Sequence, residues 1–254
     1  MDLLHAVLLL AAGLAAGFMN ALAGGGSLIT FPALLGVGLP AVPANVSNSV
    51  AVCPGYFASV YGSRKDLRGQ ERRTFLLLPT AVAGSIGGCV LLLITPEAAF
   101  DVVVPFLVLG ATAVLAFQDQ LRRVVGHPAR ISVIRQRVLL HTLVGIGAVY
   151  GGYFGAALGV MFVAGLALVL DETLARVTAV KNVLSATVGL TTVVVFALFG
   201  PVNWATVAVL APATIVGGYV GARFARRLRS DILKLVIVIF GTGIGLYLLV
   251  RAFT

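Results

Sequence analysis

The sequence predicts an all-α, polytopic integral membrane protein. Of its 254 residues, 59% are hydrophobic and only 11% are charged, whereas a soluble domain carries about 25% charged residues. The apolar residues form long runs, as at 75–95, 183–199 and 233–250, and runs of about 18 or more indicate membrane-spanning helices. The basic residues, in contrast, are confined mostly to a few short stretches between these runs.

These basic stretches predict how the chain is oriented in the bilayer. Positively charged loops stay in the cytoplasm, and three connections, 39–40, 96–101 and 200–203, carry no Lys or Arg and are therefore expected outside. A pI near 10.3 is then explained by cytoplasmic loops rather than by nucleic-acid binding. The three clusters hold 15 of the 18 Lys and Arg residues: Arg64, Lys65, Arg68, Arg72 and Arg73; Arg122, Arg123, Arg130, Arg135 and Arg137; Arg223, Arg226, Arg227, Arg229 and Lys234.

Ten segments connect these loops and place both termini outside. Two of the segments, 27–38 and 159–170, rise only about 18 Å, against a hydrocarbon core of about 30 Å. Neither crosses the bilayer alone, so each is expected to form a hairpin with its predecessor, turning at or below the membrane surface. The ten expected segments are 3–23, 27–38, 41–62, 74–94, 101–118, 138–157, 159–170, 174–199, 203–222 and 233–251.

An internal repeat predicts how the segments are organised. Sliding the sequence by 134 residues places "GFMNALAGG" over "GGYFGAALG" and gives each half five segments, one of them short. Because five is odd, the second copy is inverted, an arrangement typical of secondary transporters. We therefore expect a first transmembrane repeat at 1–118, a basic cytoplasmic linker at 119–137 and an inverted repeat at 138–254. The aligned pairs are Gly17 and Gly151, Gly25 and Gly159, Ala33 and Ala167, and Asn48 and Asn182.

Two stretches carry a resemblance to a known family. "AGGGSLITFPALLGVGLPAVPANVSNSVAVCPGYFASV" and "GGYFGAALGVMFVAGLALVLDETLARVTAVKNVLSATVGLTTVVVFALFGPVNW" resemble the TauE/SafE sulfite exporters, the family that includes the 4-toluene sulfonate uptake permeases. The second half has "AALGV" where many members keep a glycine triplet. The resemblance implies a multi-pass carrier of the bacterial inner membrane that moves small sulfur-containing anions such as sulfite, thiosulfate or organosulfonates.

The glycine triplet is the first candidate site. Gly24, Gly25 and Gly26 break the first helix, and Ser27 is a good N-cap residue for the next one. A helix N-terminus carries a partial positive charge and N–H donors that suit an anion, and glycine lets a ligand approach the backbone. The alternative is a plain tight turn between two helices.

Polar residues within the third and eighth segments complete the predicted substrate site. Asn48 and Asn182 coincide in the repeat, and amide donors suit an oxyanion, which offers only acceptors. Lys181 lies seven to ten residues into its helix, counted from Asp171 and Glu172, and a charge at that depth usually faces a cavity or a partner. The alternatives are helix-to-helix hydrogen bonds for the amides, favoured for Asn45 and Ser49, and a structural ion pair of Lys181 with Asp171 or Glu172.

Other functions fit the sequence less well. Cys53 and Cys89 lie in apolar runs and have no metal-ligand spacing, no nucleotide-binding motif is present, and we expect no cofactor. We therefore predict a non-enzymatic carrier that works by alternating access, with a small anion and the lipid bilayer as partners. Alternatives are an anion channel and, less favoured, an intramembrane enzyme in which Ser27 pairs with a histidine. Proton coupling would have to use His141, Asp171 or Glu172; uniport and anion exchange are the other options.

Overall fold

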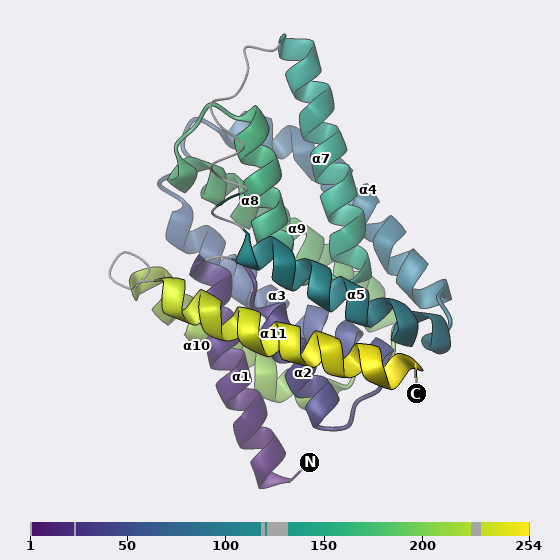
Figure 1. Ribbon diagram of the computed structural model, residues 1–254. Coiled ribbons are helices and arrows are strands. Elements are labelled where there is room, and N and C mark those ends of the chain that lie inside the picture. The colour runs from purple at the N-terminus through teal and green to yellow at the C-terminus, as the bar shows by residue number, and fades with distance from the viewer. Residues whose placement is uncertain (1, 23, 118–119, 121–131, 225–229, 254) are drawn as a thin grey trace.

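The protein was described from a computed structural model that covers residues 2–22, 24–117, 120, 132–224 and 230–253. Within these ranges it consists of ten helices and no strands, as the sequence predicted. Figure 1 shows them in chain order. They are α1 (Leu3–Leu22), α2 (Ser27–Gly36), α3 (Ala41–Ser63), α4 (Glu71–Ile94), α5 (Glu97–Ala116), α7 (Val133–Tyr153), α8 (Leu158–Val169), α9 (Leu174–Phe199), α10 (Trp204–Phe224) and α11 (Ser230–Phe253).

Most helix boundaries match the expected segments closely, and α7 is the main exception. It begins and ends four to five residues earlier than the predicted 138–157. The chain leaves the helix at Gly155 (φ +73°) and turns through Ala157 (φ +56°), a left-handed conformation that residues other than glycine seldom adopt. Because alanine gives no turn signal, the sequence placed this break a few residues late, between 157 and 159. Most of the linker expected at 119–137 lies outside the described residues. Only 120 and 132–137 are described, and 133–137 already belong to α7.

Five helices are long and apolar enough to cross a membrane: α1, α4, α5, α9 and α10. Among the others, α3 and α7 have 23 and 21 residues but contain more polar side chains. The short helices α2 and α8 have 10 and 12 residues, which correspond to about 15 and 18 Å. These dimensions agree with the expectation that each short helix forms a hairpin with the helix before it.

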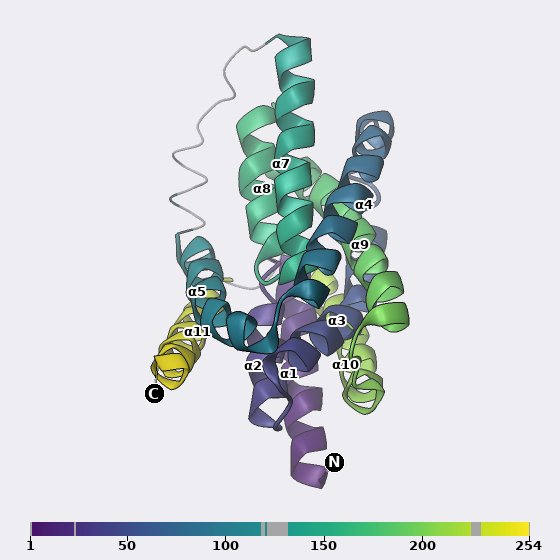
Figure 2. The same cartoon turned by 90° about the vertical axis from the view of Figure 1, so that its right-hand side faces the viewer.

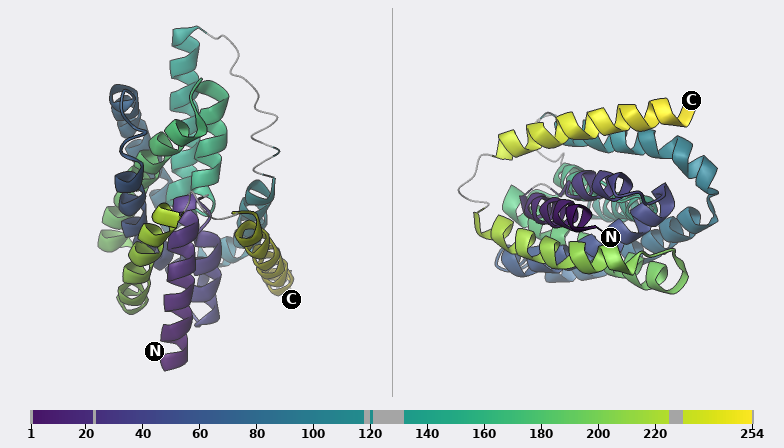
Figure 3. Two further views of the ribbon diagram at one scale, coloured as in Figure 1. Left: turned by 90° about the vertical axis from the view of Figure 1, so that its left-hand side faces the viewer. Right: turned by 90° about the horizontal axis from the view of Figure 1, so that it is seen from below.

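The two hairpins extend in opposite directions from the middle of the molecule. Figure 2 shows α1 and α2 running towards one end, and α7 and α8 towards the other. Between them, α3 packs along α9, and α5 lies beside α11 at one edge of the bundle (Figure 3). Both of these contacts join a helix before the predicted linker to a helix after it.

Helices from the two parts of the chain pack in a reciprocal pattern. The helix α1 packs against α10, and α7 packs against α4. Both pairs touch through glycines: a Cβ at Gly17 would lie 2.2 Å from the carbonyl oxygen of Thr214, and one at Gly88 would lie 2.0 Å from that of Val149. Small residues allow such backbone contact between membrane helices. The first helix of each predicted repeat therefore packs against the fourth helix of the other, the pattern that two inverted repeats would produce.

Candidate functional site

The two hairpin turns contact each other at a pair of glycines. A Cβ at Gly24 would lie 2.7 Å from the Cα of Gly159, and a Cβ at Gly159 would lie 2.8 Å from the Cα of Gly24. Gly24 also has φ +88°, where side chains are strained. The contact joins the break in each hairpin at the centre of the fold. Only glycine at both positions allows the two turns to approach this closely.

Asn20 organises the first turn from within α1. Its Oδ1 accepts a hydrogen bond of 2.8 Å from the backbone N–H of Gly26, and its side chain is 1% exposed. Gly26 occupies the N-cap position, and Ser27 is the first residue of α2. The prediction that Ser27 caps this helix is therefore wrong, because Asn20 supplies the capping oxygen from six residues upstream.

Ser27 instead lines a small cavity between the two hairpins. The cavity measures about 20 Å³, which is room for about one water molecule. It receives polar side chains from α2, α3 and α9 and small residues from the α7–α8 turn. Its lining residues are Ser27, Ser49, Val52, Tyr56, Gly151, Phe154, Gly155, Leu158, Val188, Gly189 and Thr192. Gly25, in contrast, contacts only leucine side chains, the nearest being Leu115 at 3.4 Å from its Cβ position.

Lys181 lies beside the contact between the two turns. Its side chain is 3% exposed, and its Cδ lies 3.4 Å from the Cβ position of Gly159. Both carboxylate oxygens of Glu172 are already bonded, one to Arg73 at 3.2 Å and the other to Arg176 at 2.6 Å. Lys181 and Gly24 are thus close to the same residue, Gly159.

Asn48 lies on α3, whereas Asn182 lies on α9 and contacts α3 at a different level. Asn48 accepts a hydrogen bond from the Thr30 hydroxyl and so ties α3 to α2. Asn182 donates to the Ser63 hydroxyl at 2.9 Å and to the Ser59 carbonyl at 3.3 Å. Ser59 lies 11 residues beyond Asn48 on α3, about 16 Å along the helix axis. The structure therefore does not bring the two asparagines together, and each makes a bond between helices.

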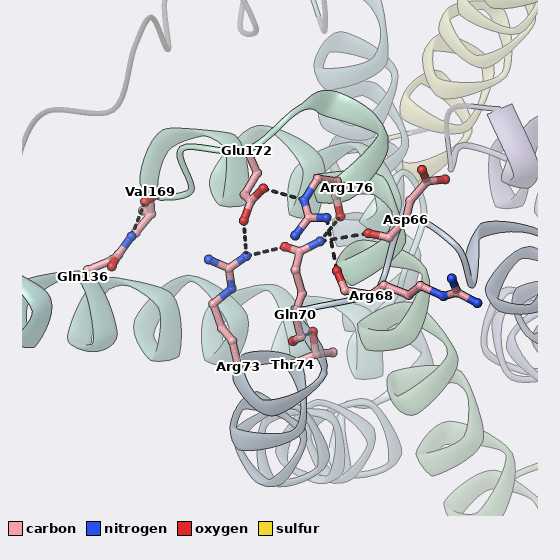
Figure 4. A network of polar contacts seen from close by, with 9 residues as sticks. All are labelled: Asp66, Arg68, Gln70, Arg73, Thr74, Gln136, Val169, Glu172 and Arg176. Carbon is pink, nitrogen blue, oxygen red and sulfur yellow. Dashed lines mark hydrogen bonds and ion pairs between the residues drawn. The ribbon is translucent and has the colours of Figure 1, made fainter.

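A polar network joins the α3–α4 and α8–α9 connections, as Figure 4 shows. Glu172 bridges Arg73 and Arg176, and the Gln70 side chain donates to the Arg176 carbonyl at 3.2 Å. Arg176 in turn donates to the Arg68 carbonyl at 3.1 Å. The hydrogen bond from Arg176, with that from Arg73, holds the pKa of the Glu172 carboxyl below its usual value. The network connects the two predicted repeats across the end that the basic loops assign to the cytoplasm.

Five side chains that the sequence did not assign to a site each have a buried atom without a hydrogen-bond partner among the described residues. Among these atoms are the Asn20 Nδ2, the Asn45 Oδ1 and the Ser185 Oγ. Asn45 uses its Nδ2 to donate to the Tyr153 carbonyl at the end of α7, and Ser185 lies one helical turn after Lys181. Asn20 is a polar residue in the apolar run that follows His5 in α1, and this was a usable signal. No comparable signal identified Tyr56, whose approach to Ser27 depends on the tertiary fold.

The histidines do not assemble a serine-type catalytic pair in the described structure. The Nδ1 of His141 lies 2.6 Å from the Thr80 hydroxyl, His5 lies in the first turn of α1, and His127 lies outside the described residues. The described residues also include no group of three or more His, Cys, Asp or Glu side chains that could hold a metal. Around the two turns, the described residues offer hydrogen-bond donors and one lysine.

Comparison with known proteins places the chain in a family. The family model described as the sulfite exporter TauE/SafE matches residues 9–248, which is nearly the whole chain. The chain belongs to the TauE/SafE family. TauE/SafE proteins are membrane transporters, and the chain is accordingly a multi-pass membrane protein. The matched range includes both hairpins, and therefore both Gly24 and Gly159.

Curated relatives of this TauE/SafE chain carry names of the same kind. The probable membrane transporter protein ORF9 of Sinorhizobium sp is 27% identical over 246 residues, covering 95% of this chain and 91% of the relative. The probable membrane transporter protein YfcA of Escherichia coli K12 is 30% identical, covering 84% and 76%. A probable membrane transporter protein of Haemophilus influenzae is 29% identical, covering 91% and 89%. No solved structure matches the chain significantly.

Proposed function

We propose that this TauE/SafE chain is a secondary transporter of small sulfur-containing anions, of the sulfite, thiosulfate or organosulfonate class, in the bacterial inner membrane. The observation that carries the proposal is the buried Lys181 beside the two contacting helix breaks, Gly24 and Gly159. A buried cation and interrupted helices are typical of substrate sites in secondary transporters. The family description supports the sulfur-anion class.

The substrate would bind near the two turns. The predicted contributors are the backbone from Gly24 to Gly26, Ser27 and the Lys181 ammonium, with Asn48 and Asn182 as residues that hold the surrounding helices in place. The Gly26 N–H is bonded to Asn20, so an anion at this helix start would compete with the asparagine oxygen. The Asn20 Nδ2 has no partner among the described residues. Rotation of the Asn20 side-chain amide could therefore direct this N–H donor at the anion in place of the oxygen.

Transport would proceed by alternating access of the two predicted repeats, 1–118 and 138–254. The reciprocal packing of α1 on α10 and α7 on α4 supports this division. The cavity between the hairpins has room for about one water, so the repeats must separate to admit a sulfonate. A closed centre of this kind favours a carrier over a continuously open anion channel.

A transport assay with reconstituted protein tests the proposal. Purified protein in proteoliposomes is given radiolabelled sulfite, thiosulfate or an aryl sulfonate, with sulfate and chloride for comparison, with and without a pH gradient. We expect saturable uptake and acceleration by unlabelled anion on the opposite side. Uptake that is driven by the pH gradient would indicate proton coupling, whereas uptake that responds only to unlabelled anion on the opposite side would indicate exchange. Non-saturating flux without counterflow would show a channel, and no flux of any sulfur anion would refute the substrate class.

Substitution of Lys181 tests its proposed role. Lys181→Met is expected to abolish anion-dependent stabilisation while the protein still inserts and folds, and Lys181→Arg, which keeps the charge but changes its shape, should only weaken transport. Lys65→Met, which removes one cation from the basic α3–α4 loop, is the matched control and should transport normally. If Lys181→Met misfolds and is rescued by Glu172→Gln, the lysine is structural and the anion site lies elsewhere.

A further inference from the structure

A second, larger cavity lies between α4 and α7, away from the two hairpin turns. It measures about 750 Å³ and is formed by the first turns of both helices with the α3–α4 and α8–α9 connections. The basic loops assign this end of the molecule to the cytoplasm. The lining residues are Gly69, Arg72, Arg73, Leu76, Leu77, Val133, Gln136, Arg137, Leu140, His141 and Glu172.

The polar part of this cavity carries an excess of positive charge. Arg72, Arg73 and Arg137 line it, against the single carboxylate of Glu172. That carboxylate is bonded to both Arg73 and Arg176, so it does not compensate the other two arginines. The Nε of Arg73 is buried and has no hydrogen-bond partner among the described residues. The cavity therefore has guanidinium donors to offer an anion with several oxygens.

The other part of the cavity is apolar and opens to the side of the bundle. Leu76 and Val133 stand at its edge, 54% and 64% exposed, and their neighbours Phe75 and Ile134 are more than two-thirds exposed. In a multi-pass membrane protein such side chains face lipid. Leu77 and Leu140, both almost fully buried, form the inner wall. An occupant would therefore meet charge at one end and hydrocarbon at the other.

The cavity closes towards the middle of the membrane. The Thr80 hydroxyl and the Nδ1 of His141 join α4 to α7 at 2.6 Å. One turn further on, a Cβ at Gly84 would lie 2.8 Å from the carbonyl oxygen of Gly145, so the two backbones are in contact. This contact between α4 and α7 separates the cavity from the Gly24–Gly159 contact. The cavity is therefore a side pocket at the bilayer surface, and its lining suits a ligand of its own.

We propose that this cavity binds an anionic phospholipid, with the phosphate held by Arg72, Arg73 and Arg137 and the acyl chains lying against Leu76 and Val133. Basic pockets between membrane helices on the cytoplasmic side suit such headgroups. A free oxyanion would use the arginines but would gain nothing from the exposed apolar edge. The lipid would also bridge α4 and α7, which belong to different predicted repeats. The proposal does not depend on which substrate the transporter carries.

Thermal unfolding of the delipidated protein in detergent tests this site. Phosphatidylglycerol, phosphatidylcholine with the same acyl chains, and inorganic phosphate are added separately. We expect a saturable rise in melting temperature with phosphatidylglycerol at concentrations well below those needed for phosphatidylcholine, and no comparable rise with phosphate. Equal effects of the two lipids would show that headgroup charge is not recognised. An equal effect of phosphate would show a free-anion site and overturn the lipid assignment.

Substitutions and labelling locate the effect. Each basic residue contributes about 1 kcal/mol to anionic-lipid binding, so Arg72→Gln with Arg137→Gln should weaken phosphatidylglycerol binding about 30-fold. Arg64→Gln with Lys65→Gln removes two cations from the same basic loop outside the cavity, and this control should bind normally. A photoreactive phosphatidylglycerol should label the wild-type chain near Leu76 or Val133. An unaffected double variant, or labelling only elsewhere, would refute the proposal.

Discussion

Replacing single glycines of the first hairpin turn separates a required close contact from an ordinary bend. Gly24→Ala places a methyl group 2.7 Å from the Cα of Gly159, a backbone atom that cannot move aside alone. It also puts alanine at φ +88°, where side chains cost about 1 kcal/mol. Overpacking a well-packed site adds about 1 to 3 kcal/mol. We expect Gly24→Ala to lower the free energy of unfolding by about 2 to 4 kcal/mol.

The neighbouring glycine supplies the matched control. A Cβ at Gly25 would meet only the flexible end of Leu115, at an ordinary contact distance of 3.4 Å, and the backbone there is not left-handed. Gly25→Ala should therefore leave stability unchanged or raise it slightly, by under about 1 kcal/mol. Gly159→Ala, on the opposite side of the contact, should resemble Gly24→Ala.

Reversible unfolding in SDS-containing mixed micelles measures the three variants, and uptake into proteoliposomes reports transport. The expected order of stability is Gly25→Ala near wild type, then Gly159→Ala and Gly24→Ala well below. Equal losses at Gly24 and Gly25 would mean that the triplet is sensitive as a whole and that the contact with Gly159 has no special weight. A stable Gly24→Ala protein would refute the close approach of the two hairpins.

Three further predictions follow from other contacts. Asn20→Ala removes the oxygen that caps Gly26 and should lower the free energy of unfolding by about 1 to 2 kcal/mol, whereas Thr95→Ala, an exposed hydroxyl, should change little in the same SDS titration. Glu172→Gln should cost about 1 kcal/mol or less at pH 7, because its ion pairs are partly exposed. Folding lowers the Glu172 pKa from 4.5. The stabilisation from its ion pairs is therefore present above pH 4.5 and is lost as the pH falls through the pKa of the folded state. Melting temperatures of the variant and the wild type, measured against pH, should converge in acid. A reporter that is active only in the cytoplasm should be inactive when fused after Thr254 and active when inserted after Lys65; activity at Thr254 would show an error of one in the number of crossings.

The sequence predicted the arrangement of helices well because its signals were local. Apolar length, basic loops and the glycine triplet marked the ten helices and the first hairpin, and the shortness of α8 marked the second. The break at Ala157 was misplaced because an alanine in a left-handed conformation is held by its surroundings, which no local signal reports. The capping of α2 by Asn20 instead of Ser27 was missed for a related reason, since the asparagine acts across a turn.

The candidate site was harder to predict than the fold. The sequence identified Lys181 and Gly24 separately, and only the tertiary packing of both against Gly159 makes them neighbours. The repeat alignment suggested that Asn48 and Asn182 act together, but equivalent positions in inverted copies lie near each other only if they lie close to the symmetry axis. Asn48 on α3 bonds to α2, whereas Asn182 on α9 bonds to the C-terminal end of α3, so sequence equivalence did not imply proximity.

The packing of α1 on α10 has a consequence for how the protein is made. Leu22 ends α1 and Trp204 begins α10, so about 180 residues are synthesised between them. At about 5 to 20 residues per second, α1 is in the membrane for about 9 to 36 seconds before its main packing partner leaves the ribosome. During that time Gly13 and Gly17 have no α10 backbone to contact. The α1–α10 contact can form only when translation is nearly finished, and assembly of this part of the bundle is therefore governed by the last fifth of the chain.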